Sequence, residues 1–243
     1  MYLVNFFIKI ITLSFLCLWS FWCSSKPIDI NHGISMGYST RFIFNSEDRR
    51  VSFPVQNNNN QKIIFHGLVL SKDKKTISEQ FIVSPEVLHV GKKKTEYPQV
   101  IRLTDNLPGD RESLFYLQGH FLPEMNQKEE SRVNLTFSYV VLMKMFYRPE
   151  KLRSSFDAID DVADQIDFKL DGKKLVVINK SPYFLTLNFL KTDKETVQIK
   201  NSQSLIDPFG QVILNIKNND VNKVTWSLIN DGGYATKLLT REL

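Results

Sequence analysis

The chain has 243 residues, with 31 basic and 26 acidic side chains, and its formal net charge of +5 is too small to favour nucleic acid as a partner. Both cysteines, Cys17 and Cys23, lie near the start of the chain. The rest of the chain therefore offers no disulfide, no thiolate and no cysteine metal site. Its length is enough for two β-sandwich domains of about 100 residues each.

Residues 1–25 have the pattern of a secretory signal peptide. They carry one charged side chain, Lys9, followed by an apolar run from Ile10 to Trp22. This run is short for a membrane span and lies at the very start of the chain. We therefore predict a cleaved leader, with a retained membrane anchor as the alternative.

After the leader, short apolar runs recur at intervals near ten residues, separated by polar clusters, which is typical of an all-β protein. We predict about seven strands before Pro149, the number that an immunoglobulin-like sandwich needs. Together with a long strand that ends at Pro149, they are Thr40–Phe44, Arg50–Val55, Lys62–Leu70, Phe81–Pro85 leading into Val87–Val90, Gln99–Leu103 and Ser113–Phe121.

Two features between these strands give separate predictions. The lysine-rich runs at 72–75 and 92–94 are interpreted as solvated turns. The Ser84–Pro85 bond lies between two strand segments and is a candidate for a cis peptide, because cis bonds are almost confined to X-Pro.

The stretch from Val133 to Pro149 predicts an unusually long strand. Apolar and polar residues alternate from Val133 to Tyr139, and both faces are apolar from Val140 to Met143. The sixteen residues from Val133 to Arg148, at about 3.3 Å each, would extend for roughly 50 Å, far beyond an ordinary strand, before Pro149 ends it. Such a strand either bends into a second sheet or leaves an edge uncovered.

The chain beyond Pro149 predicts a second sandwich. Residues 150–155 are the predicted linker, which divides an N-terminal domain at 26–149 from a C-terminal domain at 156–243. A short helical turn is expected near Phe156–Gln165. The predicted strands that follow are Ile166–Leu170, Lys174–Asn179, Tyr183–Leu190, Val197–Lys200, Val212–Ile216, Lys223–Asn230 and Tyr234–Leu239.

Catalytic and metal-binding patterns are absent from the sequence. The four histidines have no metal-ligand spacing, and there is no nucleophile elbow or phosphate-binding glycine loop. The acidic cluster at 157–164 lacks the glycine and closing glutamate of a calcium loop. We therefore predict a protein that is not an enzyme and uses no cofactor or metal.

Five separated motifs resemble those of the periplasmic pilus-assembly chaperones, the PapD-like family of the chaperone–usher pathway. The longest is Leu107–Tyr116, LPGDRESLFY, which is similar to the family signature. The others are Thr40–Phe44, Lys144–Pro149, Ser181–Phe184 and Ile229–Asp231, and all five occur in the family's order. Gln118 and Gly119 depart from it, since the signature usually has Asn or Cys and then an aliphatic residue.

This resemblance implies a fold and a function. The fold is two immunoglobulin-like sandwiches in a boomerang arrangement. Such chaperones bind pilin or fimbrial subunits in the periplasm, complement each with a strand of their own and deliver it to an outer-membrane usher. They use no nucleotide, and the resemblance implies neither a nucleic acid nor a small-molecule substrate as partner.

The resemblance also implies roles for particular residues. Arg41 and Lys144 match the two basic residues that grip the subunit's C-terminal carboxylate. Glu112, Arg148 and Asp231 resemble the salt-bridge network between the two domains. The donor strand would present Val133, Leu135, Phe137 and Tyr139, where Tyr139 replaces a residue that is more often aliphatic.

Alternation alone leaves other interpretations open. Leu135, Phe137 and Tyr139 could belong to the inward face of their own sandwich, because a period of two does not reveal which partner covers a face. Two other functions compete with the chaperone. One is a secreted two-domain immunoglobulin-like adhesin or structural module, and the other is a sandwich hydrolase, which the absence of a nucleophile–base pair disfavours.

Overall fold

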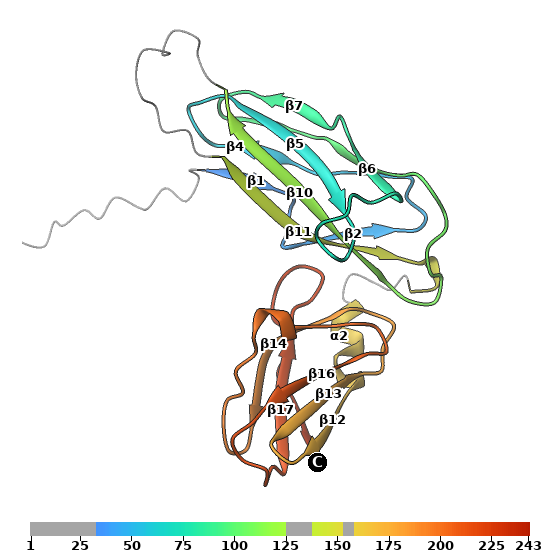
Figure 1. Cartoon of the computed structure of the whole chain (residues 1–243), viewed down its shortest axis with the longest axis vertical. Coiled ribbons are helices and arrows are strands. Elements are labelled where there is room, and N and C mark those ends of the chain that lie inside the picture. Colours follow the sequence, from blue (N-terminus) through green and yellow to red (C-terminus); the bar gives the residue numbers. More distant parts are fainter. Residues whose placement is uncertain (1–32, 125–137, 153–157) are drawn as a thin grey trace, which may run out of the picture. The chain divides into compact units, whose positions relative to one another are not determined.

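The computed structural model describes residues 33–124, 138–152 and 158–243, so the predicted leader lies outside the described residues. The described residues form two β-sandwiches, each with its own core (Figure 1). Both sandwiches belong to one compact unit that extends from Gly33 to Leu243. In this part of the chain no helix is long and apolar enough to cross a membrane.

The first sandwich is built from strands β1 to β11. They form a five-stranded sheet in the order β2-β11-β10-β5-β7 and two three-stranded sheets in the orders β1-β4-β8 and β3-β9-β6. The bounds are β1 Ile34–Met36, β2 Arg41–Asn45, β3 Arg50–Ser52, β4 Val55–Asn57, β5 Ile63–Leu70, β6 Phe81–Ser84, β7 Val87–Val90, β8 Lys94–Glu96, β9 Gln99–Arg102, β10 Ser113–Pro123 and β11 Tyr139–Arg148.

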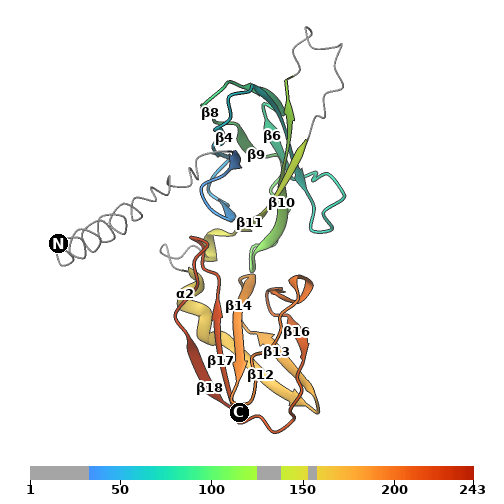
Figure 2. The ribbon, with the colours of Figure 1, turned by 90° about the vertical axis from the view of Figure 1, so that its left-hand side faces the viewer.

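The two longest strands of this sandwich, β10 and β11, are antiparallel neighbours in the five-stranded sheet (Figure 2). Their register is unbroken from the Ser113–Tyr147 pair to the Phe121–Tyr139 pair. On its other side β11 pairs in parallel with β2, but only from Lys144 onward. Within the described residues, the first half of β11 is therefore paired on one side alone.

Phenylalanine rings fill the core of the first sandwich. Phe44 and Phe81 meet edge to face with their ring centroids 5.0 Å apart. Gly67 on β5 and Gly119 on β10 are directly paired, and a Cβ on either would lie under 3.0 Å from the ring of Phe65. The ring of Phe65 thus takes the space of two side chains, which is the physical reason for glycine rather than an aliphatic residue at position 119.

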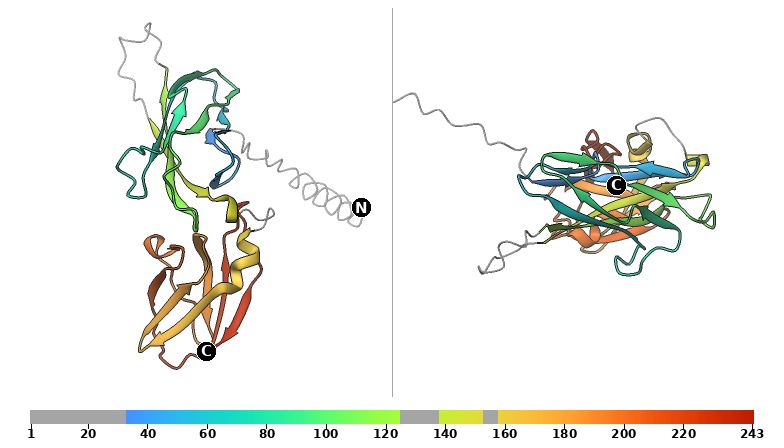
Figure 3. Two further views of the ribbon diagram at one scale, coloured as in Figure 1. Left: turned by 90° about the vertical axis from the view of Figure 1, so that its right-hand side faces the viewer. Right: turned by 90° about the horizontal axis from the view of Figure 1, so that it is seen from above.

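The second sandwich consists of a three-stranded sheet, β12-β13-β16, and a four-stranded sheet, β15-β14-β17-β18. The short helix α2, Ala158–Val162, contributes side chains to its core and is seen beside the strands in Figure 3. The strand bounds are β12 Ile166–Asp171, β13 Lys174–Asn179, β14 Leu185–Thr192, β15 Leu205–Ile206, β16 Gln211–Asn215, β17 Lys223–Leu228 and β18 Leu239–Glu242.

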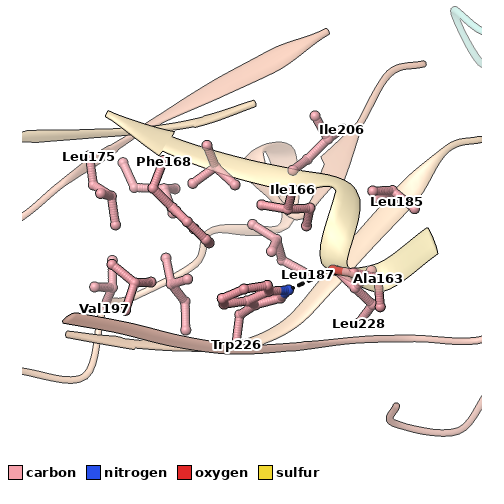
Figure 4. Close-up of a cluster of buried hydrophobic side chains, with 14 of the residues drawn as sticks. Ala163, Ile166, Phe168, Leu175, Leu185, Leu187, Val197, Ile206, Trp226 and Leu228 are labelled. Atoms are coloured by element: carbon pink, nitrogen blue, oxygen red, sulfur yellow. Dashed lines mark hydrogen bonds between the residues drawn. The ribbon is translucent and has the colours of Figure 1, made fainter. Parts of the chain in front are cut away.

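Trp226 lies at the centre of the second core, between the two sheets (Figure 4). Its ring meets Phe168 at a centroid distance of 4.9 Å. Its Nε1 donates to the main-chain oxygen of Ala163 at 3.0 Å, so the polar atom of this large side chain is satisfied where it is buried. This hydrogen bond also ties the turn after α2 to strand β17.

Several local predictions are confirmed by the structure. The strands expected over Lys62–Leu70 and Ser113–Phe121 are present as β5 and β10, and a helical turn is present at α2. The Ser84–Pro85 peptide bond is cis.

Other strand predictions are wrong. Arg50–Val55 is not one strand, because Pro54 lacks an NH and separates β3 from β4, which belong to different sheets. The count of about seven strands before Pro149 is too low, because short strands such as β1 and β8 were not expected; the described residues contain eleven.

In the second sandwich, Val197–Lys200 is an irregular segment whose first residue is buried, so its apolar pattern reflects core packing. Tyr234–Leu239 is not a strand either. Thr236 exchanges hydrogen bonds with Leu228, which folds this segment into a loop, and the last strand is β18.

Candidate functional site

Arg41 and Lys144 lie side by side on neighbouring strands. They are direct partners in the parallel pairing of β2 with β11, so their side chains project from the same face of the sheet. Lys144 is half-buried, and no carboxylate of the described residues is within ion-pair distance of it. Burial lowers the pKa of Lys144, and the nearby charges of Arg41 and Lys74 lower it further.

Arg41 is buried and donates hydrogen bonds to the main chain of the second sandwich. Its Nη1 donates to the oxygen of Ile229 at 2.9 Å and its Nη2 to the oxygen of Phe184 at 3.2 Å. Nη1 also lies 3.6 Å from Oδ1 of Asp231, and the guanidinium carbon is 4.3 Å from the ring centroid of Phe146. Nε is buried and has no hydrogen-bond partner among the described residues. Burial lowers the pKa of Arg41.

Arg148, the last residue of β11, connects Glu112 of the first sandwich with Asp231 of the second. Its Nε donates to Oε1 of Glu112 at 2.9 Å, and its Nη1 and Nη2 donate to the two oxygens of Asp231 at 2.8 and 3.0 Å. Oε2 of Glu112 accepts the main-chain NH of Phe184 at 2.8 Å. Burial opposes the charge of Arg148, but its hydrogen bonds and attraction to the two carboxylates raise its pKa above the ordinary value. Together with Arg41, the cluster contains two guanidinium groups and two carboxylates.

A pocket of about 360 Å³ opens beside Lys144 and has residues of both sandwiches in its lining. Three lysines, Lys72, Lys74 and Lys144, contribute to it, against one carboxylate, Asp207. Lys72 forms an ion pair with Asp207. The rest of the lining is apolar or uncharged and consists of Leu114, Tyr116, Asn201, Ser202 and Leu205.

The half of β11 that is paired on one side presents an apolar face that passes from core to solvent. Met145 is fully buried and Met143 nearly so, whereas Tyr139, on the same face of the strand, is 56% exposed. The inward face of β11 therefore extends beyond the core of its own sandwich. Of the four predicted donor residues, Tyr139 lies on this segment; Val133, Leu135 and Phe137 are outside the described residues.

Sequence reasoning did not single out Lys72, Lys74 or Asp207. The lysine run at 72–75 was interpreted as a solvated turn, and its side chains are indeed exposed, but two of them line the pocket next to Lys144. No local sequence signal marks this arrangement, because it depends on where the loop between β5 and β6 lies relative to β11. In the described part of the chain, no group of three or more His, Cys, Asp or Glu side chains is arranged to hold a metal ion.

Two family models match the chain. The model described as the N-terminal domain of PapD, a pili and flagellar-assembly chaperone, matches residues 34–153. The model described as the C-terminal domain of the pili assembly chaperone PapD matches residues 161–239. Together the two matches cover most of the chain.

Individual proteins are similar over nearly the same extent. Chaperone protein FimC of Escherichia coli O6:H1 is 28% identical over 210 residues, which are 86% of this chain and 83% of FimC. The crystal structure of the periplasmic chaperone SfaE is 25% identical with a TM-score of 0.69, covering 85% of this chain and 97% of SfaE. A SafB chaperone structure, solved in complex with the SafA pilin of Salmonella enterica, is 21% identical with a TM-score of 0.75 and shares the fold, covering 87% of this chain and 97% of the matched chain.

Proposed function

This chain belongs to the PapD-like family of periplasmic pilus assembly chaperones of the chaperone–usher pathway, and we propose that it binds a pilin subunit through its own β11 strand and delivers the subunit to an outer-membrane usher. Chaperones of this family are not enzymes. SafB, a relative of the same fold, is seen in complex with a pilin. The domain bounds belong to the proposal as well: a leader at 1–25, domains at 26–149 and 156–243, and a linker at 150–155.

The proposed subunit-binding element is the half of β11 that has no second strand neighbour. A strand with an unpaired edge can add a strand from another chain, because its main-chain NH and CO groups on that side lack partners. The segment from Tyr139 to Met143 has this property within the described residues. This unpaired edge of β11 is the main observation that supports the proposal.

Alternate side chains of this strand would enter the open core of the subunit. Tyr139 projects from the inward face at the point where the strand's own core ends. We assign the same role to Val133, Leu135 and Phe137, which precede it at intervals of two residues. The exposed edge and the apolar face then act together, since the edge supplies hydrogen bonds and the face supplies buried area.

The subunit's C-terminal carboxylate would be anchored at Lys144 and Arg41. The ammonium of Lys144 is partly desolvated and has no carboxylate partner among the described residues, so a bound carboxylate would supply the charge that it lacks. Arg41 adds a buried positive charge on the adjacent strand. Anchoring one end of the subunit strand in this way sets its register along β11.

The ion-pair cluster of Glu112, Arg148 and Asp231 has a positional role in this proposal. It joins the end of β11 directly to the second sandwich. Because β11 also carries the subunit-binding residues, the cluster would keep the second sandwich in place beside the bound subunit.

The test is co-purification from the periplasm with a pilin subunit of the same source organism. The unaltered chain should retain the subunit at a one-to-one ratio, and Tyr139→Glu should lose it, because a carboxylate cannot enter an apolar groove without a partner charge. Tyr97→Glu is the matched control, since Tyr97 is 59% exposed and lies outside the proposed surface. The proposal fails if a folded Tyr139→Glu protein retains the subunit as the unaltered chain does.

A further inference from the structure

The pocket beside Lys144 has an excess of positive charge that the described residues do not neutralise. Lys72 is paired with Asp207, the one carboxylate in the lining. Lys74 and Lys144 remain, and neither has a carboxylate of the described residues within ion-pair distance. Two ammonium groups in the lining thus have no carboxylate partner among the described residues.

The loop between β5 and β6 is ordered so that Lys74 lies at this pocket. The Asp73 carboxylate accepts the main-chain NH groups of Lys75 and Thr76, each at 2.9 Å, and the Thr76 hydroxyl at 2.6 Å. These hydrogen bonds, that of the Thr76 hydroxyl foremost, lower the pKa of Asp73 to about 2. Lys74 has a φ of +62°, which is uncommon for a residue other than glycine, and its Nζ lies 4.9 Å from the ring centroid of Tyr116.

The two ammonium groups repel each other. The charge of Lys74 contributes to the lowered pKa of Lys144, after burial and the charge of Arg41. This repulsion disfavours the protein without a ligand, and an anion placed between the two groups would turn it into two attractions. A carboxylate has two oxygens and can accept a hydrogen bond from each ammonium at once.

Arg41 is less suited to direct contact with an anion than Lys74. Both of its terminal nitrogens already donate to main-chain oxygens, and its side chain is 3% exposed. It is also absent from the lining of the pocket, which contains Lys74 and Lys144. A ligand in the pocket therefore meets the two lysines, with Arg41 behind them as a buried charge.

We propose that Lys74 is a further direct ligand of the subunit's C-terminal carboxylate, beside Lys144. This inference rests on the proposed function and adds to it a residue from a loop that is separate from the donor strand. The apolar lining residues Leu114, Tyr116 and Leu205 would then pack against the side chain of the subunit's last residue. The pocket would accordingly select a free carboxylate on an apolar terminal residue.

The probe is a synthetic peptide with the C-terminal sequence of the subunit that co-purifies with the unaltered chain, made as the free acid and as the C-terminal amide. Titration calorimetry gives the affinity of each form. Lys74→Ala should weaken binding of the acid about tenfold, the effect of losing one charge-assisted hydrogen bond, and should leave binding of the amide within twofold. Lys75→Ala, with the same charge in the same loop but outside the pocket lining, should bind both forms as the unaltered chain does.

The ratio of acid to amide affinity decides the result, because it isolates the interaction between Lys74 and the terminal carboxylate. The inference is overturned if Lys74→Ala keeps the ratio of the unaltered chain, and also if it weakens both forms equally, which would indicate contact with another part of the peptide. In either case the proposed function stands, since the unaltered chain still captures its subunit. If the unaltered chain captures no subunit, the proposed function and this inference fail together.

Discussion

Arg148 and Glu112 form a buried ion pair whose side chains are 6% and 0% exposed, with Nε of Arg148 donating to Oε1 of Glu112 at 2.9 Å. The pair lies where β11, which carries the proposed subunit-binding residues, ends beside the second sandwich. The partner of Glu112 on its other oxygen is the main-chain NH of Phe184, a residue of the second sandwich. Glu112 thus connects the end of β11 with the main chain of the second sandwich at Phe184.

We predict that Glu112→Gln strongly destabilises the protein. The amide keeps the shape of the side chain but removes a negative charge from a cluster of two guanidinium groups and two carboxylates. Breaking a buried pair in this way costs about 3–5 kcal/mol, and urea unfolding measures the loss. Asp110→Asn is the control, because the neighbouring pair of Asp110 with Arg111 is exposed and its loss should hardly move the midpoint. Equal midpoints for the two variants would contradict the prediction.

Arg41→Ala is expected to lower the stability of the free protein. The substitution removes the hydrogen-bond donors of the Ile229 and Phe184 oxygens and is expected to cost about 1–3 kcal/mol for each acceptor that is left without a partner. Arg41→Lys should restore the charge but only part of the stability, since an ammonium lacks the planar fork of the guanidinium. Thermal melts of the three proteins test this order, and a lysine variant as stable as the original would refute it.

Lys144→Ala should behave in the opposite way and should not lower the melting temperature at pH 7. The folded-state pKa of Lys144 is below its ordinary value, chiefly because of burial, so its charged form is less favourable in the folded than in the unfolded state. At a pH below the lowered pKa this lysine is charged in both states and the penalty is fully present. As the pH rises through the lowered pKa, the unfolded state binds more protons and the unaltered protein gains stability.

The measurement is the difference in melting temperature between Lys144→Ala and the unaltered protein from neutral to alkaline pH. The difference should favour the variant at pH 7 and shrink as the pH approaches the ordinary lysine pKa. If the advantage of the variant in melting temperature grew with pH, the prediction that burial lowers the pKa of Lys144 would be contradicted.

We predict that Gly119→Ala destabilises the first sandwich by about 1–3 kcal/mol, the usual effect of overpacking a core. The new Cβ would lie 2.8 Å from the Phe65 ring and 2.8 Å from the sulfur of Met36. Gly109→Ala is the matched control, because no atom lies within 4 Å of a Cβ built there. Combining Gly119→Ala with Phe65→Leu should recover part of the loss of Gly119→Ala if the ring is the cause, and urea unfolding of the single and double variants tests this coupling.

Local sequence patterns were sufficient to predict the longer strands of the first sandwich. Short apolar runs between polar clusters predicted β5 and β10, and the five motifs indicated the family. Similar apolar runs were misleading at Val197–Lys200, where the buried Val197 lies on an irregular segment, and at Arg50–Val55, where one proline divides the run between two sheets. A local pattern records which side chains are buried, but it does not record which strand or loop covers them.

The surroundings of each charged residue depend on the tertiary structure and could not be predicted from local sequence. The family motifs assign Arg41 and Lys144 to one carboxylate, yet Arg41 is buried with two main-chain acceptors whereas Lys144 lines a pocket with Lys74. Likewise, alternation could not tell whether Tyr139 faces its own core, and the end of that core beneath β11 leaves it exposed. Burial and electrostatic interactions depend on the distances between residues far apart in the chain, and these distances exist only once the two sandwiches have formed.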